Sequence, residues 1–272
     1  MVAGAAAGAA GAAVAGAAAD AGRRDLLRLD GVCRHFGRLQ AVQDVSFGMR
    51  EGELRAVIGP NGAGKTTFFN LITGFVAPTA GDIWFDGANI GDESVVRRVR
   101  RGIVRTFQIT EIFPDLTVYE NTRVAVETAA RLNGRAWLAR ARRREVAERV
   151  DELLVTVALA DKAHRLVGEL AHGDQRVVEI ALALAMNPRL LLLDEPTAGM
   201  GDRETEHMVE LVRRLHAEHG LSILFIEHDM GIVFGIAQRI MVLDQGRFLA
   251  EGTPGEISAD EKVRAAYLGE AA

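Results

Sequence analysis

The chain has 272 residues, 49% of them hydrophobic and 25% charged, and its formal net charge is −5. This length and hydrophobic fraction suffice for a packed core, in one large domain or a core with a subdomain, and the acidic balance argues against a general nucleic-acid-binding protein. Cys33 is the only cysteine, which excludes an intrachain disulfide and a cysteine-rich metal site and fits a reducing, cytosolic setting.

The first 22 residues are almost entirely Ala and Gly, and we expect a disordered leader there because neither residue buries much surface. A signal peptide is the alternative, but residues 1–22 lack a positive start and a strongly apolar centre. No run of about 20 strongly apolar residues occurs elsewhere, so we expect no membrane-spanning segment.

Six short apolar runs, each ended by a polar residue or glycine, predict strands, several of them buried on both faces. The predicted strands are Leu26–Asp30, Leu54–Gly59, Gly81–Phe85, Leu190–Asp194, Ser222–Glu227 and Arg239–Leu243.

A phosphate-binding loop is predicted directly after the second of these strands. The sequence GPNGAGKTT has the pattern G-x-x-x-x-G-K-T between a strand and a helix that we expect to reach about Thr73. Glycines let backbone N–H groups wrap an anion, and the helix N-terminus adds positive partial charge. Lys65 is expected to reach the β- and γ-phosphates, Thr66 to offer its hydroxyl to Mg²⁺, and Thr67 to donate near the α-phosphate. The predicted loop residues are Gly59, Asn61, Gly62, Gly64, Lys65, Thr66 and Thr67. A glycine-rich turn without a ligand is the alternative.

Between Phe113 and Met186 the pattern changes to helical spacing with many Ala and Arg. The predicted helices there are Val118–Leu132, Arg135–Leu159 and Gln175–Met186. Pro188 blocks continuation of the last one. We therefore expect an α/β core interrupted by a helical subdomain. We expect residues 23–107 and 187–253 to form the nucleotide-binding core and residues 108–186 to form the helical subdomain. Residues 254–272 should form one or two short helices.

Positive charge is concentrated in one part of this acidic chain. From Ser94 to Arg149 there are 13 arginines and 6 acidic residues, a local charge of +7. One interpretation is a solvated helical face, and the other is a face turned toward anionic lipid or an acidic partner.

Acidic and histidine side chains end two of the predicted strands. Asp194 follows four leucines and is expected to hold Mg²⁺ through water. Glu195 points differently, because neighbouring residues of a strand face opposite ways, and is placed to orient or deprotonate an attacking water. His228 follows the strand over 222–227, where it is expected to hydrogen-bond a γ-phosphate oxygen and the water. The alternatives are surface acids at a strand end and a structural histidine.

The order Lys65, Gln108, LAHGD at 170–174, Asp194-Glu195, His228 resembles that of the ATPase subunit of an ATP-binding-cassette (ABC) transporter, over about 26–269. This resemblance implies a P-loop NTPase fold: a RecA-like core with an antiparallel β edge plus an inserted helical subdomain. ATP and Mg²⁺ are the implied cofactors. Gln108, in RTFQIT, is then the Q-loop glutamine that touches Mg²⁺ and the membrane subunit, and His228 is the switch histidine.

Two further assignments rest on the same resemblance. Phe36, in RHFG, takes the place of the aromatic side chain that stacks on adenine, and an ordinary core phenylalanine is the alternative. LAHGD takes the place of the signature motif, whose usual form is L-S-G-G-Q, so that Ala171, His172 and Gly173 are implied to contact nucleotide.

The sequence departs from the family pattern at Ala171, His172 and Asp174, where Asp174 offers a carboxylate that we expect to cap the following helix. Gly201 also stands where an Asp is common in the next loop. An asymmetric heterodimer is one hypothesis for these changes, and neutral drift is the other.

Several segments narrow the resemblance to the LivG-type subunit of branched-chain amino acid importers, with the urea-importer ATPase a close cousin. They are LITGFVAPTAGDIWFDGANI, EIFPDLTVYEN, DEPTAGM, IEHDM and the ending GTPGEI…VRAAYLGE. The resemblance implies a peripheral subunit on the cytoplasmic face of the inner membrane. Its implied partners are a permease, a second ABC ATPase in a heterodimer and, indirectly, a periplasmic solute-binding protein.

Other classes fit less well. DNA-repair cassettes carry long coiled coils between Q-loop and signature, translation-factor cassettes come as tandem pairs, and a kinase or small GTPase would not carry the signature, base and switch histidine together. A regulatory ATP-binding protein without transport, and an importer ATPase for urea, amides or other small organic solutes, remain the alternatives.

Overall fold

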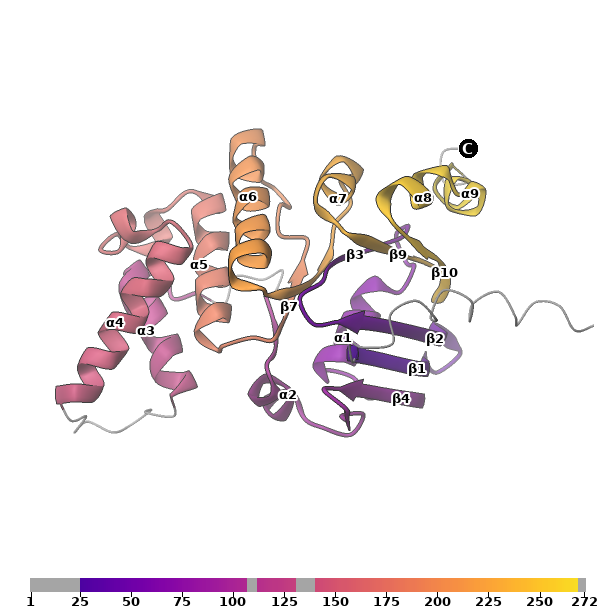
Figure 1. The fold of residues 1–272 in the computed structure, drawn as a ribbon, viewed down its shortest axis with the longest axis horizontal. Coiled ribbons are helices and arrows are strands. Elements are labelled where there is room, and N and C mark those ends of the chain that lie inside the picture. The colour runs from indigo at the N-terminus through magenta and orange to yellow at the C-terminus, as the bar shows by residue number, and fades with distance from the viewer. Residues whose placement is uncertain (1–24, 107–111, 131–139, 269–272) are drawn as a thin grey trace, which may run out of the picture.

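The computed structural model describes residues 25–106, 112–130 and 140–268. The predicted leader and Gln108 lie outside these ranges. Within them the chain forms two β-sheets with helices between and around them (Figure 1).

The smaller sheet is antiparallel, with strand order β2-β1-β4-β5. Its strands are β1 (Asp25–Phe36), β2 (Leu39–Arg50), β4 (Ala80–Phe85) and β5 (Ala88–Asn89). Alternate apolar residues of β1 and β4 are fully buried, among them the paired Leu29 and Ile83, so one face of this sheet packs on the core.

The larger sheet has strand order β10-β9-β3-β8-β7-β6, and only β10 runs antiparallel to its neighbour. Its strands are β3 (Leu54–Ile58), β6 (Ile103–Arg105), β7 (Leu190–Asp194), β8 (Ser222–Ile226), β9 (Arg239–Asp244) and β10 (Arg247–Gly252). The central strands β3, β7 and β8 are buried along their whole length, as their continuous apolar runs predict.

The two faces of this larger sheet serve two different cores. Leu190 and Leu192 of β7 pack with α1 (Lys65–Thr73) and the antiparallel sheet, whereas Leu191 and Leu193 pack against the helices on the opposite face. Helix α1 therefore lies sandwiched between the two sheets, and the loop before it is held by both.

Helix α2 (Val95–Arg101) lies on the same side of the larger sheet as α1, against which it packs (Figure 1). The remaining helices cover the other face of the larger sheet and extend beyond it. They are α3 (Val118–Ala129), α4 (Arg140–Thr156), α5 (His172–Ala185), α6 (Asp202–His219), α7 (Met230–Ile236), α8 (Pro254–Ala259) and α9 (Glu261–Leu268). Helices α3, α4 and α5 gather at one end of the molecule, far from the antiparallel sheet (Figure 1). Among the helices in the described ranges, none has the length and apolar character needed to cross a bilayer.

Each of the six predicted strands is present, and β1 runs six residues further than predicted. Strands β2, β5, β6 and β10 were not predicted. The prediction for the start of α5 was wrong: the helix begins at His172, three residues early, with Ala171 as its N-cap.

Candidate active site

The loop between β3 and α1 has room for glycine but not for larger residues at two positions. Gly59 has φ 156°, and a Cβ there would lie 2.1 Å from the carbonyl oxygen of Leu243. Gly64 has φ 99°, and a Cβ there would lie 2.4 Å from the carbonyl oxygen of Ala41. Both positions have a left-handed backbone that glycine adopts at little cost. Gly64 is also the N-cap residue of α1. Because glycine has no side chain that could cap the helix, the backbone N–H groups at the N-terminus of α1 are suited to binding an anion.

The loop borders a pocket of about 750 Å³. This pocket brings Lys65, Thr66 and Thr67 of α1 together with Glu195 and His228, which come from the tips of two neighbouring strands. Asn61, Gly62 and Gly64 line it as well. The predicted residues Gly59, Phe36, Asp194, Ala171, His172 and Gly173 are not among the pocket lining.

Lys65 is held inside the loop that it follows. Its ammonium donates to the carbonyl oxygens of Gly59 at 2.6 Å and Pro60 at 3.0 Å, and the residue is only 7% exposed. A buried ammonium at a helix N-terminus, beside the turn, gives the pocket a fixed positive end.

Glu195 and His228 form the opposite side of the pocket. Strands β7 and β8 are parallel, so the residues that follow them meet at one edge of the sheet. Glu195 turns out of β7 with a positive φ of 50°, and its backbone N–H donates to Ile226 at 3.0 Å. One of its carboxylate oxygens lies 2.8 Å from Nε2 of His228. The arrangement joins a base candidate to a histidine beside a positively charged loop.

Asp194 is buried at the end of β7 and contacts a residue that the sequence analysis missed. The guanidinium of Arg105, at the end of β6, forms an ion pair with its carboxylate and bonds Asn70 of α1 at 2.7 Å. Arg105 ends a short apolar run, three residues before Gln108, and this basic ending of a buried strand was the available signal.

Glu227 is a second residue whose role was missed. It is 5% exposed, and its carboxylate accepts from the N–H of Thr197 at 2.9 Å and from the hydroxyl of Thr197 at 2.6 Å. It thereby ties the end of β8 to the turn that carries Glu195. Nothing in the sequence distinguished Glu227 from the flanking polar residues.

Phe36 lies at the end of β1, and its ring is 44% exposed, which excludes the alternative of an ordinary core phenylalanine. The guanidinium of Arg34 lies 4.5 Å from the ring centroid. Phe36 precedes the hairpin whose residues Leu39 and Gln40 line the pocket.

The segment LAHGD forms the start of α5, on a surface separate from the pocket. Gly173 is buried, and its N–H donates to the carboxylate of Glu204 in α6 at 3.2 Å. Asp174 does not cap the helix, contrary to the expectation. Its carboxylate forms an ion pair with Lys162 at 2.7 Å, because it lies within the first turn and faces the short 3₁₀ segment Ala160–Lys162. Ala171 and His172 are exposed.

A family model described as "ABC transporter" matches residues 42–198, more than half of the chain. The chain belongs to the ABC transporter family. A second model, described as "Branched-chain amino acid ATP-binding cassette transporter", matches residues 249–272. Among known relatives, the high-affinity branched-chain amino acid transport ATP-binding protein BraF of Pseudomonas aeruginosa is 42% identical, over 91% of this chain and 99% of its own length. The high-affinity branched-chain amino acid transport ATP-binding protein LivG of Escherichia coli K12 is 41% identical, over 90% of this chain and 98% of its own length.

Solved structures agree with this assignment. An ATP-binding cassette of an ABC transporter in its ADP conformation has a TM-score of 0.79 at 30% identity, covering 90% of this chain and 99% of its own. A nucleotide-free cassette has a TM-score of 0.78 at 29% identity, with the same coverage. The family resemblance and the fold class are thus confirmed: the chain is an ABC ATPase, and it binds nucleotide.

Proposed function

We propose that this ABC ATPase drives the import of branched-chain amino acids through a membrane permease, on the cytoplasmic face of the membrane. The observation that carries the proposal is the similarity to LivG and BraF over about nine-tenths of the chain, together with the match at 249–272. That match covers α8 and α9, which lie outside the nucleotide pocket, so it reflects more than the shared ATPase machinery.

The pocket supports a division of labour during ATP hydrolysis. Lys65 exchanges its loop carbonyls for phosphate oxygens, since an ammonium binds a charged oxygen more strongly than a neutral one. Glu195 orients and deprotonates the attacking water. His228, bonded to Glu195, fixes that carboxylate and donates to the γ-phosphate. Phe36 stacks on adenine across its exposed ring.

Mg²⁺ fits the donor set of this site. Thr66 in the first turn of α1 offers a hydroxyl and Asp194 at the end of β7 offers a carboxylate, and both are hard oxygen ligands. Gln108 would add its amide oxygen. Bound Mg²⁺ supplies neutralisation of the phosphate charge that develops during the reaction.

The signature segment at the start of α5 serves a second nucleotide, on the partner ATPase. This chain's own pocket is not lined by Ala171, His172 or Gly173. In a head-to-tail dimer this segment would instead face the nucleotide that the partner subunit binds. The proposed partner is a second, different ABC ATPase.

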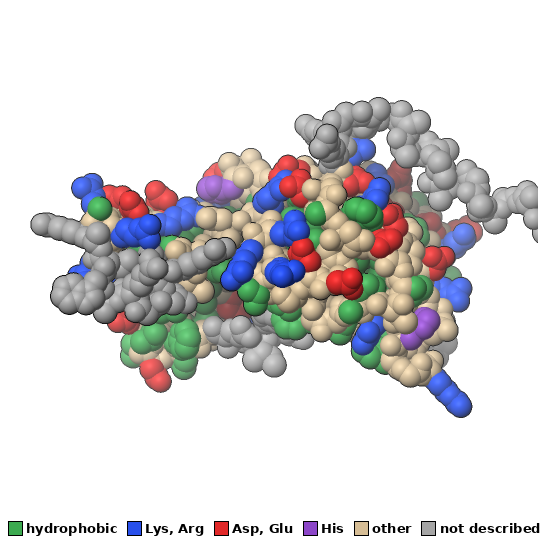
Figure 2. All heavy atoms as spheres, turned by 90° about the horizontal axis from the view of Figure 1, so that it is seen from below, with side chains coloured by type: hydrophobic (Ala, Val, Ile, Leu, Met, Phe, Trp, Pro, Cys, Tyr) green, Lys and Arg blue, Asp and Glu red, His purple; other side chains and the backbone are tan. Residues whose placement is uncertain are grey.

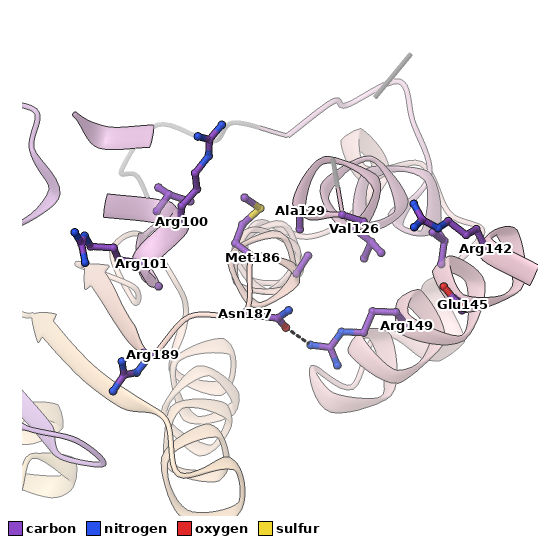
Figure 3. A pocket seen from close by; sticks show the side chains of 15 residues that line it. Arg100, Arg101, Val126, Ala129, Arg142, Glu145, Arg149, Met186, Asn187 and Arg189 are labelled. Carbon is purple, nitrogen blue, oxygen red and sulfur yellow. Dashed lines mark hydrogen bonds between the residues drawn. The ribbon is translucent and has the colours of Figure 1, made fainter. Parts of the chain in front are cut away.

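A groove between the core and the helical end suits the permease. Its volume is about 760 Å³, and it lies between the end of α2, the C-terminal ends of α3 and α5, and the start of α4. Five arginines line it, and Figure 3 shows them on both sides. They are Arg100, Arg101, Arg142, Arg149 and Arg189. On the face seen from below (Figure 2), Lys and Arg side chains gather over the middle of the molecule. An acidic or amide-rich segment of the permease would complement this groove.

Reconstitution tests the proposal. The chain would be expressed with the products of its neighbouring genes, and ATP-dependent uptake of labelled leucine, isoleucine and valine into vesicles that contain them would be measured. We expect uptake that Glu195→Gln abolishes. Uptake of urea in place of these amino acids would overturn the substrate assignment, and ATPase activity without association with any permease would overturn the transport role.

A further inference from the structure

Asp194 has a cationic partner within the chain. Its side chain and that of Arg105 are each 6% exposed, and the two form an ion pair between the tips of the neighbouring strands β7 and β6. The other arm of the guanidinium donates to Asn70 of α1 at 2.7 Å, and the group lies 5.5 Å from the ring centroid of Phe69. Arg105 is therefore held on three sides, with its charge directed at Asp194.

Burial explains why the carboxylate needs this partner. An ionised carboxylate removed from water is strongly destabilised unless a nearby positive charge and hydrogen bonds offset the loss of hydration. Arg105 supplies both from one rigid, planar group. In the proposed function the same carboxylate also holds Mg²⁺. The Arg105 guanidinium and Mg²⁺ would then both interact with the buried carboxylate of Asp194.

We propose that Arg105 is a positioning residue that holds Asp194 before the metal arrives and competes with Mg²⁺ for its carboxylate. This inference rests on the proposed function, since it takes Asp194 as the metal carboxylate. Arg105 thereby sets the Mg²⁺ concentration at which nucleotide binds, because a guanidinium beside a divalent cation raises the electrostatic cost of its binding. Linkage makes the effect reciprocal: Mg²⁺ weakens the Arg105–Asp194 pair by the same factor.

The test is a Mg²⁺ titration of nucleotide binding to the full chain. The affinity for the non-hydrolysable analogue AMP-PNP would be measured by calorimetry at rising Mg²⁺ concentration. Arg105→Gln should lower the half-saturating Mg²⁺ concentration by roughly five- to tenfold, the size of a modest coupling between sites. Arg105→Lys, which keeps the charge, should stay within about threefold of the wild type on the same argument.

Two controls separate competition from a general structural effect. Arg55→Gln breaks another buried arginine–carboxylate pair, in which the Arg55 side chain is 7% exposed and bonds Glu251 at 2.8 Å, outside the nucleotide pocket. It should lower the melting temperature without changing the Mg²⁺ requirement. In an Asp194→Asn background, Arg105→Gln should shift the requirement by less than about twofold, because the shared carboxylate is gone.

The outcomes are distinguishable. If Arg105→Gln raises the Mg²⁺ requirement, leaves it unchanged or weakens AMP-PNP binding equally at every Mg²⁺ concentration, competition is wrong and the pair is only structural. If Arg105→Gln does not fold, Arg105→Met provides the same test, because it also removes the charge, and no drop in Mg²⁺ requirement would again overturn the inference. If the wild type binds no AMP-PNP with Mg²⁺, both the inference and the proposed function fall.

Discussion

Lys65 and Glu195 line one pocket from different elements, so mutation can separate nucleotide binding from chemistry. Lys65→Ala removes the ammonium that we assign to the phosphates. A hydrogen bond to a charged group is worth about 1.5–3 kcal/mol, so ATP affinity should fall roughly ten- to a hundredfold. Equilibrium binding of labelled ATP measures this. An unchanged affinity would remove Lys65 from the phosphate-binding role.

Glu195→Gln should reduce ATP turnover but not ATP affinity, the opposite of Lys65→Ala. The amide keeps the shape of the side chain but cannot take a proton, so turnover should fall by about 10²–10⁴-fold while ATP binding is retained. Phosphate release tests the expected loss of turnover, and nucleotide binding, measured on the same assembled complex, tests whether ATP affinity is retained. Near-normal phosphate release would exclude Glu195 as the base.

At the scale of single residues, the sequence predicted those whose spacing along the chain is fixed by phosphate and metal binding. Lys65 and Thr66 follow a glycine loop in every chain that wraps phosphate this way, and Asp194 ends an apolar strand. Arg105 and Glu204 were not predicted as partners, because Asp194 lies 89 residues from Arg105 and Gly173 lies 31 residues from Glu204. The pairing of β6 with β7 brings the first pair together, and the packing of α5 beside α6 brings the second.

At the scale of elements, Arg98 joins α1 to α2. It is 1% exposed, and its guanidinium donates to the last-turn carbonyls of Leu71 and Ile72 and to those of Gly91 and Glu93. Burial lowers its pKa to about 10, so it stays protonated at neutral pH. A positive charge at the C-terminus of α1 is also favourable for the helix dipole.

Replacing Arg98 by Met should destabilise the chain, because four carbonyl groups would lose their donor. We expect a loss of about 3 kcal/mol, or roughly 6–12 °C in melting temperature. Arg101→Met is the matched control on the same helix, since its ion pair with Glu93 is exposed and worth at most about 1 kcal/mol. Equal melting temperatures for the two variants, by circular dichroism, would show that the buried contacts of Arg98 contribute nothing.

Helix α4 carries five of the 13 arginines in the positively charged segment, whereas Arg98 and Arg105 of that segment are buried. Reversing Arg142, Arg143 and Arg144 to Glu should weaken binding to the permease, by reversing the charge of exposed side chains at and beside the groove, of which Arg142 lines it. ATP binding should persist, since none of the three lines the nucleotide pocket.

The control for this reversal changes Arg28, Lys262 and Arg264 to Glu. These basic residues are exposed on β1 and α9 and do not line the groove. Co-purification with the permease, at several salt concentrations, is the measurement. If both triple variants co-purify like the wild type, the arginines form only a solvated face.

Element prediction failed where the local pattern was weak. Strand β2 alternates buried apolar residues with Gln and Asp, β10 lies at the sheet edge, and β6 has only three residues. Their strand character comes from pairing with β1, β9 and β7, which is not visible in their own composition. The pocket residues Gln40 and Gln43 lie on β2 and were missed with it.

At the scale of the whole molecule, the two surfaces that we propose for nucleotide lie on different elements. The loop with Lys65 lies beside the antiparallel sheet, while the start of α5 borders the helical end of the molecule, beside α6 (Figure 1). The segment at 170–174 does not line the chain's own pocket, so in our proposal a second subunit completes each site. In the proposed head-to-tail dimer, each signature would lie on the other subunit's ATP.

We propose that the altered signature makes the two sites of such a heterodimer unequal. The helix start and Gly173 are retained, and the N–H of Gly173 donates to Glu204 within this chain. Asp174 pairs with Lys162, so its carboxylate is neutralised. The remaining loss is a serine hydroxyl at Ala171, a single hydrogen bond to a charged group. Its absence is worth about 1.5–3 kcal/mol, or roughly ten- to a hundredfold in rate if it acts only in the transition state.

We therefore expect this chain's own ATP to be hydrolysed against the partner's signature, and the partner's ATP to turn over more slowly. Disabling one base at a time in the assembled complex tests this asymmetry. Glu195→Gln should remove most phosphate release, because the site that it disables faces the fuller signature. The equivalent change in the partner should remove little. Ala171→Ser should raise the activity that remains after Glu195→Gln, because it restores the missing hydroxyl at the partner's site. Equal losses from the two base variants, with no gain from Ala171→Ser, would show that LAHGD is a neutral variant of the signature.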